Sequence, residues 1–370
     1  MSTHTTSKEL EAQPTTMKAI VQDRYGSADV LELRDVDKPE LGDDDVLLRV
    51  HAAGVHIGGD WHLMTGLPYL MRIMGFGFCA PKARVRGMDV AGTVEAVGKN
   101  VTRFQAGAEV FGTCDGSFTE YACARADKLA PKPANLGFEQ AAAVPTSACT
   151  ALQALRDSGG IKNEQKVLIV GASGGVGMFA VQIAKSFGTK VTGVCSTTKV
   201  DTVRSIGADH VIGYTKEDFT RGWKRYDLIL DMGGNRSLSQ LRRALTLRGT
   251  LVLVGGEGGG RWIGGVDRSI RALVASPFVS HRLCMIIATE QGGPAVPEGA
   301  RRGRHYHAGY RQDVFAERGA RRHPLPARGT GSGEDRHHGS RRRPRRLREI
   351  LRTESTAPIM TSPKVGSDTA

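Results

Sequence analysis

The stretch KVLIVGASGGVGMFAVQIAKSFG (166–188) decides the fold. An apolar strand, KVLIV, runs into a glycine-rich turn at 171–177, and the turn opens a segment typical of an amphipathic helix. This succession is the dinucleotide-binding fingerprint, in which the first N–H groups of the helix face a pyrophosphate. Ala172 occupies the first glycine position, Gly174 lies where backbone approaches phosphate, and Gly177 lets the helix pack on the strand. The predicted cofactor turn is completed by Ser173, Gly175 and Val176.

Further apolar segments decide between this site and a plain strand–helix turn without a ligand. They lie at 190–195, 209–214, 226–231, 249–255 and 283–288. Strands that alternate with helical patterns indicate βαβ units and a parallel sheet covered on both faces. We therefore predict an α/β fold whose residues 138–290 form a doubly wound Rossmann domain that binds a dinucleotide.

The end of the second of these strands indicates which nicotinamide cofactor is bound. Enzymes that use NAD place a carboxylate there to hold the ribose 2′-hydroxyl. This chain reads CSTTK (195–199), with no carboxylate before Asp201, so Ser196 and Lys199 offer a hydroxyl and a cation instead. Such groups suit a 2′-phosphate, and NADP(H) is the predicted cofactor. The alternative is that Lys199 only begins the next helix in solvent.

Upstream of the Rossmann domain the pattern changes to short β-type runs. Segments such as DVLLRVHAAGV (45–55) and DVAGTVEAVG (89–98) are separated by Gly, Pro and Asp, which predicts a mostly β domain over 17–137. The polar residues 1–16 are predicted to be a flexible extension.

The net charge of +13 over 370 residues invites a nucleic-acid hypothesis. Residues 291–370, however, hold 17 Lys and Arg against 8 Asp and Glu, so most of the excess lies in this basic, predicted disordered tail. The run RRRPRRLR (341–348) permits nucleic-acid binding and nothing else in the chain supports it. We predict that nucleic acid is not the partner.

Cysteines and hydropathy bear on the compartment. The six cysteines include no CxxC pair, so reduced thiols are expected rather than disulfides or a structural zinc site. No stretch approaches the ~18 apolar residues of a membrane span, and residues 1–16 have neither an apolar signal core nor an Arg-rich face. A cytoplasmic protein without membrane contact is predicted.

From residue 17 to about residue 290 the chain resembles the medium-chain dehydrogenase/reductases, in their zinc-free quinone oxidoreductase branch. The resemblance rests on MKAIVQDRYG, RGMDVAGTVEAVGKNVTRFQAGAEVFG, GSFTEYACARADKLAPKP, AAAVPTSACTALQAL, VLIVGASGGVG and IGADHVIGY. It implies a GroES-like β domain joined to a Rossmann domain, with substrate and nicotinamide between them, and a homodimer.

The resemblance also implies further cofactor residues. Lys199 and Tyr214 match the family's contacts to the 2′-phosphate, with Ser196 near them. Thr146 matches a residue beside the nicotinamide. Positions that line the cofactor at the end of the fifth strand are matched by Val254 and Gly255, although a packing role is the alternative, above all for Val254.

The ligands that hold catalytic zinc in related alcohol dehydrogenases are missing. Met88 stands where their His would be, and Ser147 stands where their second Cys would be. His56 with Asp60 or His62 supplies two donors, whereas a catalytic zinc site uses three protein ligands. A zinc-independent enzyme is predicted, with no metal.

Without zinc, the substrate must be activated by conjugation, as in a quinone or an α,β-unsaturated carbonyl compound. The segment DWHLMTGLPYLMRIMGFGF (60–78) supplies the catalytic candidates Asp60, Trp61, His62 and Tyr69. The two aromatic side chains could stack on a flat ring and the imidazole could pass a proton; a lid packed on the core is the alternative. An alcohol dehydrogenase-type activity and a cofactor-binding protein without turnover also stay open.

The tail at 291–370 does not continue the family pattern. Back-translated and moved forward by one nucleotide, residues 303–326 can encode TPVIDKTFSLSEVPDAIRYL, and residues 330–338 can encode a segment ending in ARGKIVIT. Both resemble the family's C terminus. The hypothesis is that a frameshift near Gln291 replaced that terminus, which would leave part of the β domain uncovered.

Overall fold

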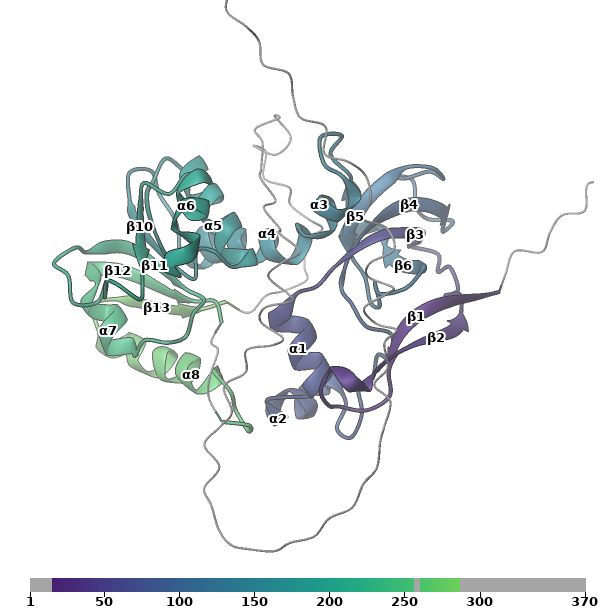
Figure 1. Cartoon of the computed structure of the whole chain (residues 1–370), viewed down its shortest axis with the longest axis horizontal. Coiled ribbons are helices and arrows are strands. Elements are labelled where there is room, and N and C mark those ends of the chain that lie inside the picture. Colours follow the sequence, from purple (N-terminus) through teal and green to yellow (C-terminus); the bar gives the residue numbers. More distant parts are fainter. Residues whose placement is uncertain (1–14, 256–259, 287–370) are drawn as a thin grey trace, which may run out of the picture. The chain divides into compact units, whose positions relative to one another are not determined.

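The computed structural model describes residues 15–255 and 260–286. The described elements form an antiparallel β domain followed by a parallel α/β domain (Figure 1).

The β domain is built on a five-stranded antiparallel sheet with the order β6-β3-β4-β5-β7. Its strands are β3 (Asp45–Gly54), β4 (Asp89–Val97), β5 (Glu109–Thr113), β6 (Tyr121–Arg125) and β7 (Leu129–Pro131). Alternate residues of a strand face opposite sides, so Val46 and Leu48 of β3 enter the same core as Val90 and Val94 of β4. A separate hairpin pairs β1 (Thr16–Gln22) with β2 (Leu31–Asp37).

Short helices follow β3 within the β domain, and others follow β7, where the chain leads into the α/β domain. After β3 come α1 (Ile57–Thr65), α2 (Tyr69–Met71) and a π-helical turn at Arg72–Phe76. After β7 come α3 (Phe138–Ala142) and α4 (Pro145–Leu152), and α4 continues into a second π-helical turn, Gln153–Ser158. Pro145 stands at the first turn of α4, where its missing N–H has no helical acceptor to lose.

The α/β domain has a six-stranded parallel sheet with the order β10-β9-β8-β11-β12-β13. Its strands are β8 (Lys166–Val170), β9 (Lys190–Cys195), β10 (His210–Gly213), β11 (Tyr226–Asp231), β12 (Leu245–Leu253) and β13 (Arg282–Met285). Its helices are α5 (Gly175–Ser186), α6 (Val200–Ser205), α7 (Leu238–Arg243) and α8 (Val266–Ala275). Val167 and Ile169 join one core cluster, while Leu168 and Val170 join another, so β8 is buried on both faces as a parallel strand requires.

These findings confirm the predicted fold class. Strands β8, β9 and β11 span the predicted residues, and β12 begins at Leu245, four residues before the predicted start. Strand β2 was not predicted, because Glu, Arg and Asp alternate with its few apolar residues and half of it is exposed. The predictions for residues 1–14 and for the tail at 291–370 lie outside the described residues.

Candidate functional site

The glycine turn after β8 places the start of α5 at the carboxyl edge of the sheet. Gly171 has φ +91°, a left-handed conformation that favours glycine. A Cβ atom on Gly177 would clash with the Gly171 carbonyl oxygen, so glycine is needed where helix meets strand. Ala172 is fully buried, whereas Gly174, the residue before the helix, is exposed. The turn therefore leaves the first N–H groups of a 12-residue helix available to an anion.

Ser196, Lys199 and Tyr214 gather beside this turn, at the ends of β9 and β10. Cys195 pairs with Gly213 across the two parallel strands, and the Tyr214 N–H donates to the Cys195 carbonyl at 3.1 Å. Tyr214 is 54% exposed, and the charge of Lys199 is close enough to oppose the effect of burial on the pKa of the Cys195 thiol. Two hydroxyl-bearing side chains and a cation thus follow the ends of these two strands.

The first carboxylate after β9 does not take the place of a ribose ligand. Asp201 lies in the first turn of α6, is 96% exposed and accepts a hydrogen bond from Arg204 at 2.9 Å. The carboxylate of Asp201 is therefore engaged by a neighbouring arginine at the protein surface.

The neighbouring strands end at the same edge. Val254 follows β12, donates its N–H to the Asp231 carbonyl and packs against the core, and Gly255 is exposed beside it. Asp231, the last residue of β11, has no exposed surface, and Arg268 of α8 forms an ion pair with its carboxylate. Sequence reasoning missed this pair; an acidic residue closing the apolar strand YDLILD was the available signal.

Thr146 lies in the first turn of α4 and is bound to a buried carboxylate that was not predicted as a site residue. Its Oγ1–H donates to Asp89 Oδ1 at 2.5 Å, and its N–H donates to Oδ1 at 3.2 Å and to Oδ2 at 3.4 Å. Asp89, the first residue of β4, is 3% exposed. Burial raises its pKa to about 7, although the bonds from Thr146 oppose the shift.

Asp60 lies close enough to this carboxylate for its charge to contribute to the raised pKa of Asp89. Asp60 Oδ2 accepts from the His56 N–H at 2.7 Å, and His56 Nδ1 accepts from the Gly59 N–H at 3.0 Å. The two side chains thereby cap the start of α1. Burial raises the pKa of Asp60 and lowers that of His56, and the charge of buried Arg86 partly opposes the shift at Asp60.

The other three catalytic candidates do not converge with Asp60. Trp61 and His62 follow it on α1, and His62 Nδ1 donates to the Leu67 carbonyl at 2.5 Å. Tyr69 is engaged elsewhere: its ring meets the Trp262 ring edge-on, with centroids 5.3 Å apart, and the Arg72 guanidinium lies 4.9 Å from its centroid. The structure therefore fits Tyr69 as part of a packed segment.

The residues present do not fit a catalytic zinc site. Among residues 15–255 and 260–286 no three His, Cys, Asp or Glu side chains cluster as metal ligands. His56 Nδ1 and Asp60 Oδ2 are occupied by backbone N–H groups, and Met88 and Ser147 stand at the positions of the missing ligands.

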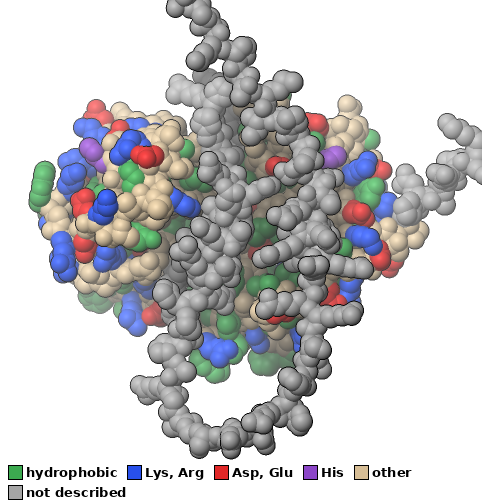
Figure 2. Space-filling view, in the orientation of Figure 1, with side chains coloured by type: hydrophobic (Ala, Val, Ile, Leu, Met, Phe, Trp, Pro, Cys, Tyr) green, Lys and Arg blue, Asp and Glu red, His purple; other side chains and the backbone are tan. Residues whose placement is uncertain are grey.

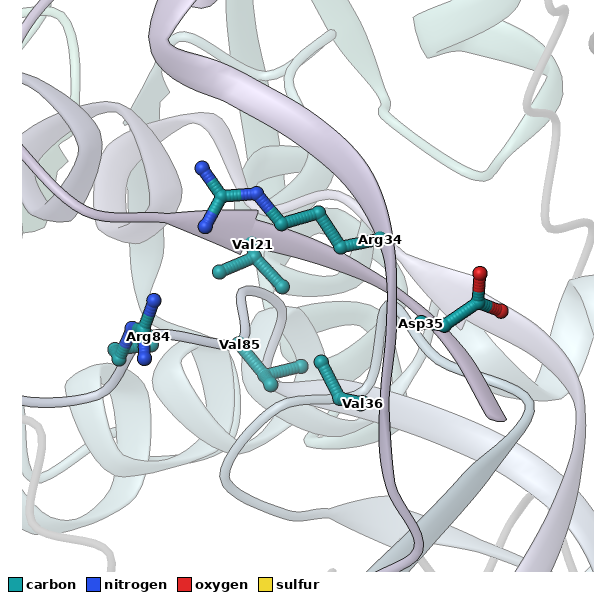
Figure 3. A pocket seen from close by; sticks show the side chains of 6 residues that line it. All are labelled: Val21, Arg34, Asp35, Val36, Arg84 and Val85. Atoms are coloured by element: carbon teal, nitrogen blue, oxygen red, sulfur yellow. The ribbon is translucent and has the colours of Figure 1, made fainter. Parts of the chain in front are cut away.

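A shallow hollow of about 370 Å³ lies beside β1 and β2 (Figure 3). It is lined by Val21, Arg34, Asp35, Val36, Arg84 and Val85. Both of its arginines form ion pairs with Asp23, and none of its residues belongs to the predicted site. On the face shown in Figure 2, basic and acidic side chains of the described residues are interspersed, which gives no support to a nucleic-acid surface there.

The described residues include all six cysteines, and none of these forms a disulfide. Within residues 15–255 and 260–286, no helix has the length and apolar character needed to cross a membrane.

Comparisons with known proteins agree with this two-domain architecture. Residues 42–134 match the alcohol dehydrogenase GroES-like domain, and residues 175–273 match the zinc-binding dehydrogenase family. The chain is 35% identical over 252 residues to quinone oxidoreductase of Sus scrofa, which covers 65% of this chain and 74% of that protein. It is also 35% identical over 235 residues to 2-methylene-furan-3-one reductase of Solanum lycopersicum, which covers 60% of this chain and 58% of that protein.

A solved structure, Escherichia coli quinone oxidoreductase complexed with NADPH, superposes with a TM-score of 0.62 at 25% identity, covering 73% of this chain and 81% of that one. A GroES-like domain followed by a dinucleotide-binding domain defines a nicotinamide-dependent dehydrogenase or reductase. The chain belongs to the medium-chain dehydrogenase/reductase superfamily, and within it is quinone oxidoreductase-like.

Proposed function

We propose that this oxidoreductase uses NADPH, without zinc, to reduce a quinone or an α,β-unsaturated carbonyl compound. The observation that carries the proposal is the group of Ser196, Lys199 and Tyr214 at the ends of β9 and β10, next to the glycine turn. The names of the relatives support both substrate classes, and the NADPH complex of the E. coli protein supports the cofactor.

The protein's own groups would hold the cofactor by its charged parts. The start of α5 would bind the pyrophosphate, and Lys199 with Ser196 and Tyr214 would bind the 2′-phosphate. Thr146 would lie beside the nicotinamide, which supplies hydride when bound. Trp61 would pack on a flat substrate, and the His62 imidazole would lie near that substrate.

Binding titrations test the cofactor proposal. Lys199→Ala should weaken NADPH binding about 10-fold or more, because a charge-assisted contact to phosphate is lost, and should leave NADH binding unchanged. Lys190→Ala is the matched control, because Lys190 begins the same strand at its opposite end. Equal affinity of the unmodified protein for NADPH and NADH would contradict the proposal.

A reaction panel tests the substrate proposal. NADPH oxidation with quinones and enones, and none with simple alcohols and NADP⁺, is the expected result. Turnover of alcohols alone would favour an alcohol dehydrogenase. Tight NADPH binding without turnover of any compound would favour a cofactor-binding protein without catalysis.

We also propose that the sequence from about Gln291 comes from a shifted reading frame. The support is that the alternative frame can encode segments that match the family's C terminus in the same order along the chain. Resequencing the locus tests this directly: an undisturbed frame, whose alternative does not resemble the family, would contradict the proposal. A homodimer and a cytoplasmic location stay predictions; light scattering and cell fractionation would check them.

A further inference from the structure

Asp89 and Thr146 join a buried acid to a half-buried hydroxyl. The 2.5 Å bond from Thr146 Oγ1–H and the two bonds from its N–H all end on the Asp89 carboxylate. Asp89 is 3% exposed, whereas Thr146 keeps part of its surface open.

The surroundings of Asp89 raise its pKa to about 7, which favours the neutral form below that pH. Of the groups that face it, Asp60 of α1 contributes a negative charge, and Cys114 after β5 is a buried thiol whose pKa is raised to about 12. Backbone surrounds the rest: a Cβ on Gly54 would lie 3.0 Å from the Asp89 Cβ and would clash with the Ala142 carbonyl oxygen. The pKa of about 7 allows Asp89 both to hold and to release a proton under ordinary conditions.

We propose that Asp89 and Thr146 form a proton relay to the reduced substrate. Thr146 is the catalytic hydroxyl that donates to the substrate, and Asp89 is the positioning residue that orients this hydroxyl and returns its proton. The proposal rests on the proposed function, which places Thr146 beside the nicotinamide and the substrate.

Each bond in the step can be followed for an enone. When bound, the reduced nicotinamide would supply a hydride: a C–H bond of the cofactor would break and one would form at the conjugated carbon, which would leave negative charge on the substrate oxygen. When Asp89 is neutral, its O–H donates to Thr146 Oγ1, so the bond described above is reversed and the Thr146 O–H is available to the substrate. The Thr146 O–H bond would then break as its proton passes to the substrate oxygen, and the Asp89 O–H bond would break as its proton passes to Thr146. Asp89 ends ionised and takes up one proton from solvent before the next turnover.

The relay predicts effects on kcat rather than on binding. In Asp89→Asn the amide oxygen still accepts from the Thr146 N–H, but no acid remains to return a proton to the Thr146 hydroxyl. With NADPH and an enone, kcat should fall about 100-fold, KM for both reactants should change less than about 2-fold, and the dependence of kcat on pH near 7 should vanish. Thr146→Ser should retain the wild-type pH profile, and Thr146→Val should behave like Asp89→Asn.

A readout without turnover accompanies the kinetics. The infrared carbonyl band of a protonated buried carboxyl should be present at pH 5, decline through pH 7 and be missing in Asp89→Asn. Asp35→Asn, at a carboxylate that is 67% exposed, is the matched control and should keep both the band and the kcat profile.

The outcomes separate the two proposals. If the wild type reduces enones and Asp89→Asn keeps its rate and pH profile, the relay is wrong and the proposed function stands. If the band does not titrate near pH 7, the relay is also wrong. If the wild type oxidises NADPH with no quinone or enone, the proposed function fails and the relay falls with it.

Discussion

Replacing Asp89 by Asn should make the protein less sensitive to rising pH. The folded carboxyl has a pKa of about 7, against 3.8 for an ordinary Asp, so the folded state holds a proton that the unfolded state releases. Between about pH 4 and pH 7 the folded state therefore binds more protons, and the free energy of unfolding falls as the pH rises. The amide in the Asp89→Asn variant cannot ionise, which removes this dependence.

The size of the effect follows from the two pKa values. One pKa unit corresponds to about 1.4 kcal/mol, so the full loss is about 4 kcal/mol, of which about 2.5 kcal/mol falls between pH 5 and pH 8. Asp89 is 3% exposed, so solvent screening reduces this value little.

Urea unfolding at pH 5, 6, 7 and 8, followed by circular dichroism, measures the difference between wild type and Asp89→Asn. The contributions of the other carboxylates cancel in this difference, and Asp35→Asn controls for the introduction of an amide. The stability of Asp89→Asn relative to wild type should rise by about 2.5 kcal/mol across the range. A difference that stays flat with pH would refute the argument from burial.

Two more predictions concern packing and charge at the sheet edge. Gly177→Ala should cost about 1–3 kcal/mol of stability and weaken NADPH binding, because the added Cβ would clash with the carbonyl oxygen of Gly171. Thermal unfolding and NADPH titration measure the two effects. Gly222→Ala is the control and should be neutral in both assays, because the nearest neighbour of its Cβ would lie 3.9 Å away. Arg268→Met should cost about 3–5 kcal/mol by urea unfolding, since it leaves the Asp231 carboxylate buried and unpaired; a double variant with Asp231→Leu should recover most of the loss, and no recovery would contradict this account.

Sequence reasoning succeeded where a local pattern determines the structure. The apolar run KVLIV indicates a strand in the middle of a sheet that is covered on both faces. Strand β8 lies in such a position, and its alternate residues belong to two different core clusters. The glycine turn was also predicted from a local pattern, the run of glycines between strand and helix, and within it Gly171 has φ +91°. Parallel pairing then brings Ser196 and Tyr214 together without further information.

The rest depends on contacts between residues far apart in the chain. Thr146 and Asp89 are separated by 57 positions, so the bond between them has no local signature. Tyr69 suggests a stacking surface when taken alone, but its partners include Trp262, whose position follows from tertiary folding. A side chain's neighbours in a loop-rich segment cannot be deduced from periodicity, because no regular face orders them.

Stability of the fold alone does not favour a buried carboxylate at the start of β4. An amide of the same shape would accept the Thr146 N–H and avoid the desolvation that raises the pKa of Asp89. A stability loss of about 4 kcal/mol at alkaline pH is a large share of the roughly 5–15 kcal/mol that typically separates folded from unfolded domains. A group that weakens the fold while bonding to a residue at the expected nicotinamide site is better explained by what it does for that residue than by packing. A test of proton transfer should therefore vary Asp89 before the more exposed His62.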